Sequence, residues 1–220
     1  SQRALARLQQ REAARAAQAP ITRIDARQPK DQAPIVIVTG LPRSGTSLMM
    51  QMLHRGGLAV QADEQRPADH NNPKGYFEWE VIKTLEQTPD TIDAAAGKAV
   101  KVVSLLLQFL PKDRRYDFIW MERPIDEVHR SQQSMLKNLG SSSEAAAKTL
   151  ASHCASVLTQ LETQWCQDTR FARLLKIPYY DCIGSPEATA AKVAEFLPQH
   201  TLDTAAMVSC IDPSLHRSKL

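Results

Sequence analysis

One stretch near the start of the chain limits the fold more than any other. Residues 35–38 (Ile-Val-Ile-Val) form a short β-branched run, which is typical of a strand buried on both faces. Residues 40–45 follow as a turn with two glycines and a proline, and from Thr46 onward the composition and spacing are those of a helix. A strand, a glycine loop and a helix in this order present backbone N–H groups and a helix N-terminus to an anion. The sequence therefore predicts a phosphate-binding loop.

The loop differs from an ordinary nucleotide-hydrolysing P-loop at one position. Gly40 to Ser47 fits the pattern G-x-x-x-x-G-K-[ST], except that Thr46 takes the place of the lysine. ATP or GTP hydrolysis needs that lysine on the β- and γ-phosphates, so it is disfavoured here. The nearest cation is Arg43, inside the loop, and its planar guanidinium suits the oxygens of a transferring sulfuryl or phosphoryl group. The simpler alternative is a glycine turn with an exposed arginine.

Residues 42–47, Pro-Arg-Ser-Gly-Thr-Ser, resemble the 5′-phosphosulfate loop of the sulfotransferases in its bacterial form. Members of that family transfer a sulfuryl group from 3′-phosphoadenosine 5′-phosphosulfate (PAPS) to a hydroxyl or an amine. The resemblance implies PAPS as the co-substrate and a nucleotide-binding role for the loop. The residues concerned are Gly40, Pro42, Arg43, Ser44, Gly45, Thr46 and Ser47.

A second match to the same family lies downstream. In sulfotransferases the 3′-phosphate is held by an arginine that closes a strand and by a serine eight residues later, and Arg123 and Ser131 have that spacing. Arg123 would end a parallel strand, where open α/β sheets bind ligands. Arg217 is placed like the family's C-terminal basic residue over the same phosphate, although a terminal arginine is usually only solvated.

The sequence departs from the family at the catalytic base. Cytosolic members often carry a histidine before Leu-Pro, and here Phe109 stands in its place. The resemblance then implies a carboxylate base from elsewhere, whose pKa partial burial would raise toward the working range. Each candidate would otherwise be a solvated loop charge. In order of preference the candidates are Glu78, Glu64 and Asp63.

The two leading candidate bases and one candidate substrate-binding lysine are supported by different arguments. Glu78 follows Gly-Tyr-Phe after a turn that can fold over the site. Glu64 lies at the distance after the loop where the tyrosylprotein branch of the family reads E-E-T-R. Lys101 lies on an expected strand and is a candidate to anchor substrate or leaving group, the alternative being a lysine that reaches along apolar surface to solvent.

The rest of the chain alternates short apolar runs with helix-forming stretches. This alternation predicts a three-layer α/β/α, P-loop-type fold with a mainly parallel central sheet. We expect further strands at residues 58–60, 99–107, 116–121 and 173–179. We expect helices beginning at residues 78 and 124, two helices within residues 143–165, and one at residues 186–196.

The positive charge of the chain belongs to its first 30 residues. These carry seven basic against two acidic residues, a net charge of +5, whereas the whole chain carries +3. Residues 1–30 are therefore expected to be a basic helical leader or linker, and residues 31–220 a single sulfotransferase-like domain. The leader would contact an anionic surface, connect to a preceding domain, or be a solvated helix packed loosely on the domain.

Several features point to a cytoplasmic protein. Four cysteines lack the spacing of a metal site or disulfide framework, and the chain starts without an apolar signal region. No apolar run approaches the length of a membrane span. We expect no metal and no nucleic-acid partner.

The sequence as a whole predicts a PAPS-dependent sulfotransferase. The acceptor is not encoded in a recognisable motif, so a lipid, a saccharide, a small alcohol and a peptide tyrosine all remain open. Two rival hypotheses are a P-loop small-molecule kinase, which Thr46 disfavours, and a non-catalytic nucleotide-binding module.

Overall fold

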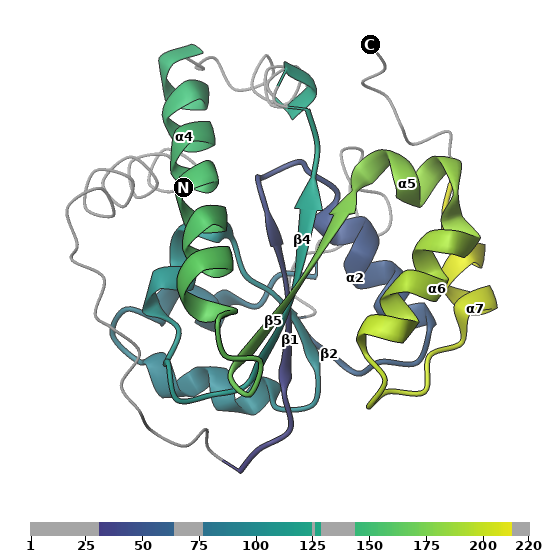
Figure 1. Ribbon diagram of the computed structural model, residues 1–220, viewed down its shortest axis with the longest axis horizontal. Helices are drawn as coiled ribbons and strands as arrows, with labels where there is room; N and C mark the ends of the chain where they lie inside the picture. The colour runs from purple at the N-terminus through teal and green to yellow at the C-terminus, as the bar shows by residue number, and fades with distance from the viewer. Residues whose placement is uncertain (1–30, 64–76, 125, 129–143, 213–220) are drawn as a thin grey trace.

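The computed structural model describes residues 31–63, 77–124, 126–128 and 144–212. Within them a five-stranded sheet has the order β2-β3-β1-β4-β5 (Figure 1). Every neighbouring pair of strands is parallel, which confirms the predicted α/β fold class. The strands are β1 (Ile35–Gly40), β2 (Val60–Gln61), β3 (Ala99–Lys101), β4 (Tyr116–Glu122) and β5 (Ala172–Pro178).

Helical elements cover both faces of this sheet and complete the three layers (Figure 1). One face is covered by α2 (Thr46–Arg55), α5 (Tyr179–Gly184), α6 (Pro186–Phe196) and α7 (Thr204–Ser209). The other is covered by α4 (Glu144–Gln160) with its π-helical extension η4 (Leu161–Trp165), and by the 3₁₀ segments η1 (Glu80–Thr84), η2 (Pro89–Ala95) and η3 (Ser104–Phe109).

The position of β1 at the centre of the sheet explains why its side chains are apolar on both faces. All six are buried. Ile35 and Ile37 pack into the core beneath α4, whereas Val36 and Val38 pack into the core beneath α2. Because successive side chains of a strand point to opposite faces, a strand between two layers needs an unbroken apolar run.

The expected strand over residues 99–107 is wrong beyond Lys101. The backbone leaves the sheet after the Val102 amide donates to the Val38 carbonyl, and residues 104–109 form η3. Leu106 and Leu107 of this run are buried in the α4-side core, and the Ser104 hydroxyl lies 2.9 Å from the Cys154 sulfur. Packing against α4, rather than strand pairing, thus accounts for the apolar run.

Other boundaries also differ from expectation. Residues 144–165 form α4 and its π-helical extension rather than two separate helices, and the helix expected at Glu78 begins at Glu80 as a 3₁₀ segment. The short helices α5 and α7 were not anticipated. The expected helix at 186–196 is confirmed with its bounds.

Candidate functional site

The loop between β1 and α2 has a backbone that its glycines require. Gly40 and Gly45 have φ values of 144° and 101°. A Cβ atom on Gly40 would lie 2.6 Å from the Met121 carbonyl oxygen, and one on Gly45 would lie 2.5 Å from the Tyr179 ring. Both positions therefore exclude a side chain on conformational and on steric grounds.

Arg43 also has a left-handed backbone, with φ of 74°. A residue with a side chain adopts this conformation uncommonly and at a cost of order 1–3 kcal/mol, which surrounding contacts must offset. One such contact is the Ser44 amide, which donates to the Leu41 carbonyl at 3.0 Å and closes the turn. The loop is thus held in a specific, strained shape at the mouth of α2.

Ser44 gives the loop an interior polar atom. The residue is fully buried, and its hydroxyl has no hydrogen-bond partner among the residues that the structure describes. The hydroxyl oxygen lies 2.7 Å from the position of a Cβ on Gly40, so it faces the inside of the turn. An unsatisfied buried hydroxyl costs about 1–3 kcal/mol, so a ligand oxygen here would relieve a real penalty.

The helix that follows supports the same interpretation. Thr46 and Ser47 form the first turn of α2, whose N-cap, Gly45, makes no side-chain cap. The first turn contains no acidic residue, so no carboxylate in it offsets the positive end of the helix dipole. The loop residues Gly40 to Ser47, Pro42 included, are therefore brought together in one turn at the start of α2, a geometry that would suit an anion.

Arg123 lies directly beside this loop. It follows β4, and Met121 pairs with Gly40 at the same edge of the sheet. Its Nη1 donates to the Arg43 carbonyl oxygen at 3.0 Å, and its Nε donates to the Glu127 carboxylate at 3.0 Å. The two arginines that the sequence singled out, 80 residues apart, therefore share one corner of the molecule.

Tyr179, at the start of α5, lies against the Arg123 guanidinium. The Arg123 guanidinium carbon lies 4.4 Å from the centre of its ring. Burial raises the pKa of the Tyr179 hydroxyl above its ordinary value, and the positive charges of Arg123 and Arg43 oppose that rise. The Tyr179 ring thus lies between the loop and the Arg123–Glu127 pair.

Two of the three candidate carboxylates lie at the same edge of the sheet. Lys101 ends β3, which pairs with β1, and its Nζ lies 3.8 Å from the Glu78 carboxylate. Both side chains are largely sequestered, with exposures of 10% for Lys101 and 28% for Glu78. The Asp63 carboxylate instead accepts a hydrogen bond of 2.6 Å from the Glu80 amide at the start of η1. This bond satisfies the first amide of η1.

Three predicted site residues lie outside the described part of the chain. They are Glu64, Ser131 and Arg217, and the basic leader over residues 1–30 lies outside it too. The sequence analysis did not assign Glu127, Tyr179 or Tyr180 to the site. The spacing of four residues between Arg123 and Glu127 at a helix start is a signal that points to an ion pair.

Neither a metal centre nor a membrane-spanning helix is found in the described residues. In residues 31–63, 77–124, 126–128 and 144–212, no three His, Cys, Asp or Glu side chains gather as metal ligands would. Over the same ranges no helix has the length and apolar character needed to cross a bilayer.

No protein-family model matches the chain, and no curated protein is similar to it in sequence. Among solved structures, sulfotransferase STF9 from Mycobacterium avium is 14% identical with a TM-score of 0.49, covering 93% of this chain and 71% of that one. The sulfotransferase domain of the curacin biosynthetic pathway is 15% identical with a TM-score of 0.45, covering 86% and 92%. A sugar kinase from Janibacter sp. is 13% identical with a TM-score of 0.41, covering 83% and 98%. Several sulfotransferases are thus among the solved structures that resemble this chain, at TM-scores below 0.5 and with a kinase beside them.

Proposed function

We propose that this chain is a sulfotransferase that moves a sulfuryl group from PAPS to a hydroxyl or amine acceptor. One observation carries the proposal: Arg43 lies within a glycine turn at the start of α2, and Arg123 donates a hydrogen bond to its carbonyl. A P-loop kinase would place a lysine at the mouth of α2, where this chain has Thr46.

In this proposal the two phosphate groups of the nucleotide have separate sites. The loop amides with Ser44, Thr46 and Ser47 hold the 5′-phosphosulfate, and the orphaned Ser44 hydroxyl gains a partner there. Arg123, with Ser131, holds the 3′-phosphate, and Arg217 covers it. The Arg123 side chain is 8% exposed. It would bond the phosphate through the N–H groups of Nη2, while Nε bonds Glu127 and Nη1 bonds the Arg43 carbonyl.

The transfer itself needs charge stabilisation more than covalent chemistry. The acceptor oxygen or nitrogen attacks sulfur, the bond between sulfur and the 5′-phosphate oxygen breaks, and 3′-phosphoadenosine 5′-phosphate (PAP) leaves. Arg43 offsets the negative charge that develops on the sulfuryl oxygens and on the departing phosphate. A preorganised group of this kind is worth about 3 kcal/mol in the transition state.

A base must take the proton that the acceptor loses, and we propose Glu78 for this role. Its carboxylate is partly sequestered at the carboxyl edge of the sheet, beside the Lys101 ammonium. Lys101 would orient it or anchor the leaving group. Asp63 is the weaker candidate because its carboxylate accepts a hydrogen bond from the start of η1. Glu64 stays the second candidate base, as in the sequence analysis.

Thermal unfolding with two nucleotides tests the donor. PAP at 100 times its Kd should stabilise the folded chain by about 2.7 kcal/mol, whereas ATP with Mg²⁺ should leave Tm unchanged. Transfer of labelled sulfate from PAPS to a panel of alcohols, saccharides, lipids and tyrosyl peptides then tests the reaction. Stabilisation by ATP–Mg²⁺ with transfer of labelled phosphate would establish the kinase hypothesis instead. Tight PAP binding without transfer to any acceptor would favour a nucleotide-binding module.

A further inference from the structure

A buried carboxylate lies behind Arg123. Glu127 is fully buried, and one of its oxygens accepts the bond from Arg123 Nε at 3.0 Å. Its other oxygen accepts a hydrogen bond from the Tyr180 hydroxyl, which comes from α5. We call Arg123, Glu127 and Tyr180 the arginine clamp. It joins the end of β4 to the start of α5.

The clamp reaches the loop through one hydrogen bond. With Nε held by Glu127 and the guanidinium face against Tyr179, Nη1 of Arg123 is directed to the Arg43 carbonyl oxygen. Arg43 is also the residue of the loop with the uncommon left-handed φ of 74°. A bond to its carbonyl therefore supports the strained peptide on which the shape of the turn depends.

We propose that Glu127 is a positioning residue for the phosphate loop. Together with Tyr180 it fixes the Arg123 guanidinium so that this arginine holds the Arg43 backbone in its anion-binding shape. The consequence for PAPS binding rests on the function proposed above, whereas the consequence for the loop itself does not.

The chain offers a matched control for a merely structural role. Asp117, near the start of the same strand β4, is also buried (2% exposed) and accepts a bond of 2.7 Å from Arg173 Nε. It therefore has the same kind of arginine–carboxylate pair at the opposite end of the sheet from the loop. Loss of either pair should lower stability, but only loss of the Glu127 pair should change the loop.

The test compares Glu127→Gln, Tyr180→Phe and Asp117→Asn in the nucleotide-free chain by amide hydrogen exchange. In Glu127→Gln the Ser44 amide, bonded to Leu41 in the folded loop, should exchange roughly tenfold faster, as expected for loss of one charge-assisted hydrogen bond. Tyr180→Phe keeps the ion pair and should give a smaller increase in the same peptide. Asp117→Asn should leave it unchanged.

The outcomes separate the two proposals. Unchanged loop exchange in Glu127→Gln, or an equal increase in Asp117→Asn, would overturn the positioning role. If Glu127→Gln does not fold, Tyr180→Phe decides: unchanged loop exchange in that variant overturns the role. PAP affinity of the same proteins is then measured by calorimetry, with a roughly tenfold loss expected in Glu127→Gln alone. Failure of the wild-type chain to bind PAP would refute the donor assignment and leave the exchange result standing.

Discussion

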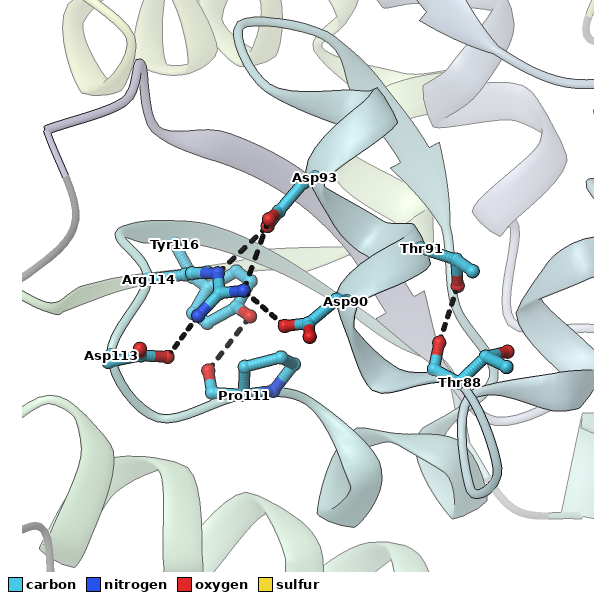
Figure 2. Close-up of polar contacts among 8 residues, drawn as sticks. All are labelled: Thr88, Asp90, Thr91, Asp93, Pro111, Asp113, Arg114 and Tyr116. Carbon is cyan, nitrogen blue, oxygen red and sulfur yellow. Dashed lines mark hydrogen bonds and ion pairs between the residues drawn. The ribbon is translucent and has the colours of Figure 1, made fainter.

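Two buried arginines flank strand β4, and they have different surroundings. Arg114, just before the strand, is 3% exposed and bonds the carboxylates of Asp90, Asp93 and Asp113 (Figure 2). Arg123, just after the strand, has one carboxylate partner among the described residues, Glu127. Its other contacts there are a loop carbonyl and the face of an aromatic ring.

This difference separates a structural arginine from one suited to binding anions. At Arg114, burial alone would lower the pKa, but the bonds to Asp93 and Asp113 raise it, so the guanidinium is charged and more than neutralised. The Tyr116 hydroxyl bonds the Pro111 carbonyl next to this cluster (Figure 2). At Arg123 the single carboxylate is directed to Nε, away from the loop. We infer that charged side chains at the amino end of the sheet stabilise the fold. Those at the carboxyl end would bind the anionic donor of the function proposed above.

The largest effect is expected at Arg43. Arg43→Ala should lower the rate of sulfuryl transfer about 100- to 1,000-fold, because a preorganised charge is lost from the transition state. Alanine meets the same backbone strain as arginine at φ 74°, so Tm should change little. Arg43→Lys keeps a positive charge without the planar guanidinium, so its transfer rate should lie between those of the wild type and Arg43→Ala. Near-normal turnover in Arg43→Ala would refute the proposed role of charge at the carboxyl end of the sheet.

Glu78 is expected to show the next largest effect. If the Glu78 carboxylate takes the proton that the substrate hydroxyl or amine loses, Glu78→Gln should slow transfer about 100-fold. PAP affinity should stay unchanged. Asp63→Asn is the matched control, since it weakens the hydrogen bond to the Glu80 amide and should cost about 1 kcal/mol of stability but little activity. The two variants are compared by single-turnover kinetics. If only Asp63→Asn lowers the transfer rate, Asp63 rather than Glu78 is the catalytic base.

Arg114 tests the amino end of the sheet. Arg114→Ala should lower the free energy of unfolding by about 2 kcal/mol, less than for a wholly buried ion pair because Asp90 is 80% exposed. PAP affinity should be unchanged. Arg115→Ala, which among the described residues removes bonds to the Gln32 carbonyl, is the control and should cost less. Urea unfolding measures the stabilities, and weaker PAP binding in Arg114→Ala would contradict the division between the two ends.

The smallest effect concerns His200, which lies near Asp117. Burial lowers the pKa of His200 below its ordinary value of 6.5, and the negative charge of Asp117 opposes that shift. The unfolded chain therefore takes up a proton at higher pH than the folded one, so stability should fall as the pH drops below about 6.5. His200→Gln should flatten this decline in denaturant titrations between pH 7 and pH 5. An unchanged slope would show that His200 does not contribute.

The strand–loop–helix unit was predictable because its constraints are local. Four β-branched residues between two layers, glycines at two positive φ angles and a helix-forming run are properties of neighbouring residues, and the structure has them where the sequence places them. The same holds for helix α6, which begins with a proline and ends where expected. Residues 102–107 were misassigned because an apolar run suits a strand or a packed 3₁₀ turn equally, and only contact with α4 decides between them.

The sequence by itself determined the loop, its arginine and the parallel α/β architecture around it, since each follows from spacing and periodicity over a few residues. Tertiary structure alone decided that Arg123 donates to the Arg43 carbonyl, that Tyr180 donates to the Glu127 carboxylate, and that Glu78 lies beside Lys101. These contacts join residues brought together by strand order and helix packing. The free energy that selects them comes from burying paired charges in a specific geometry, which no local pattern records.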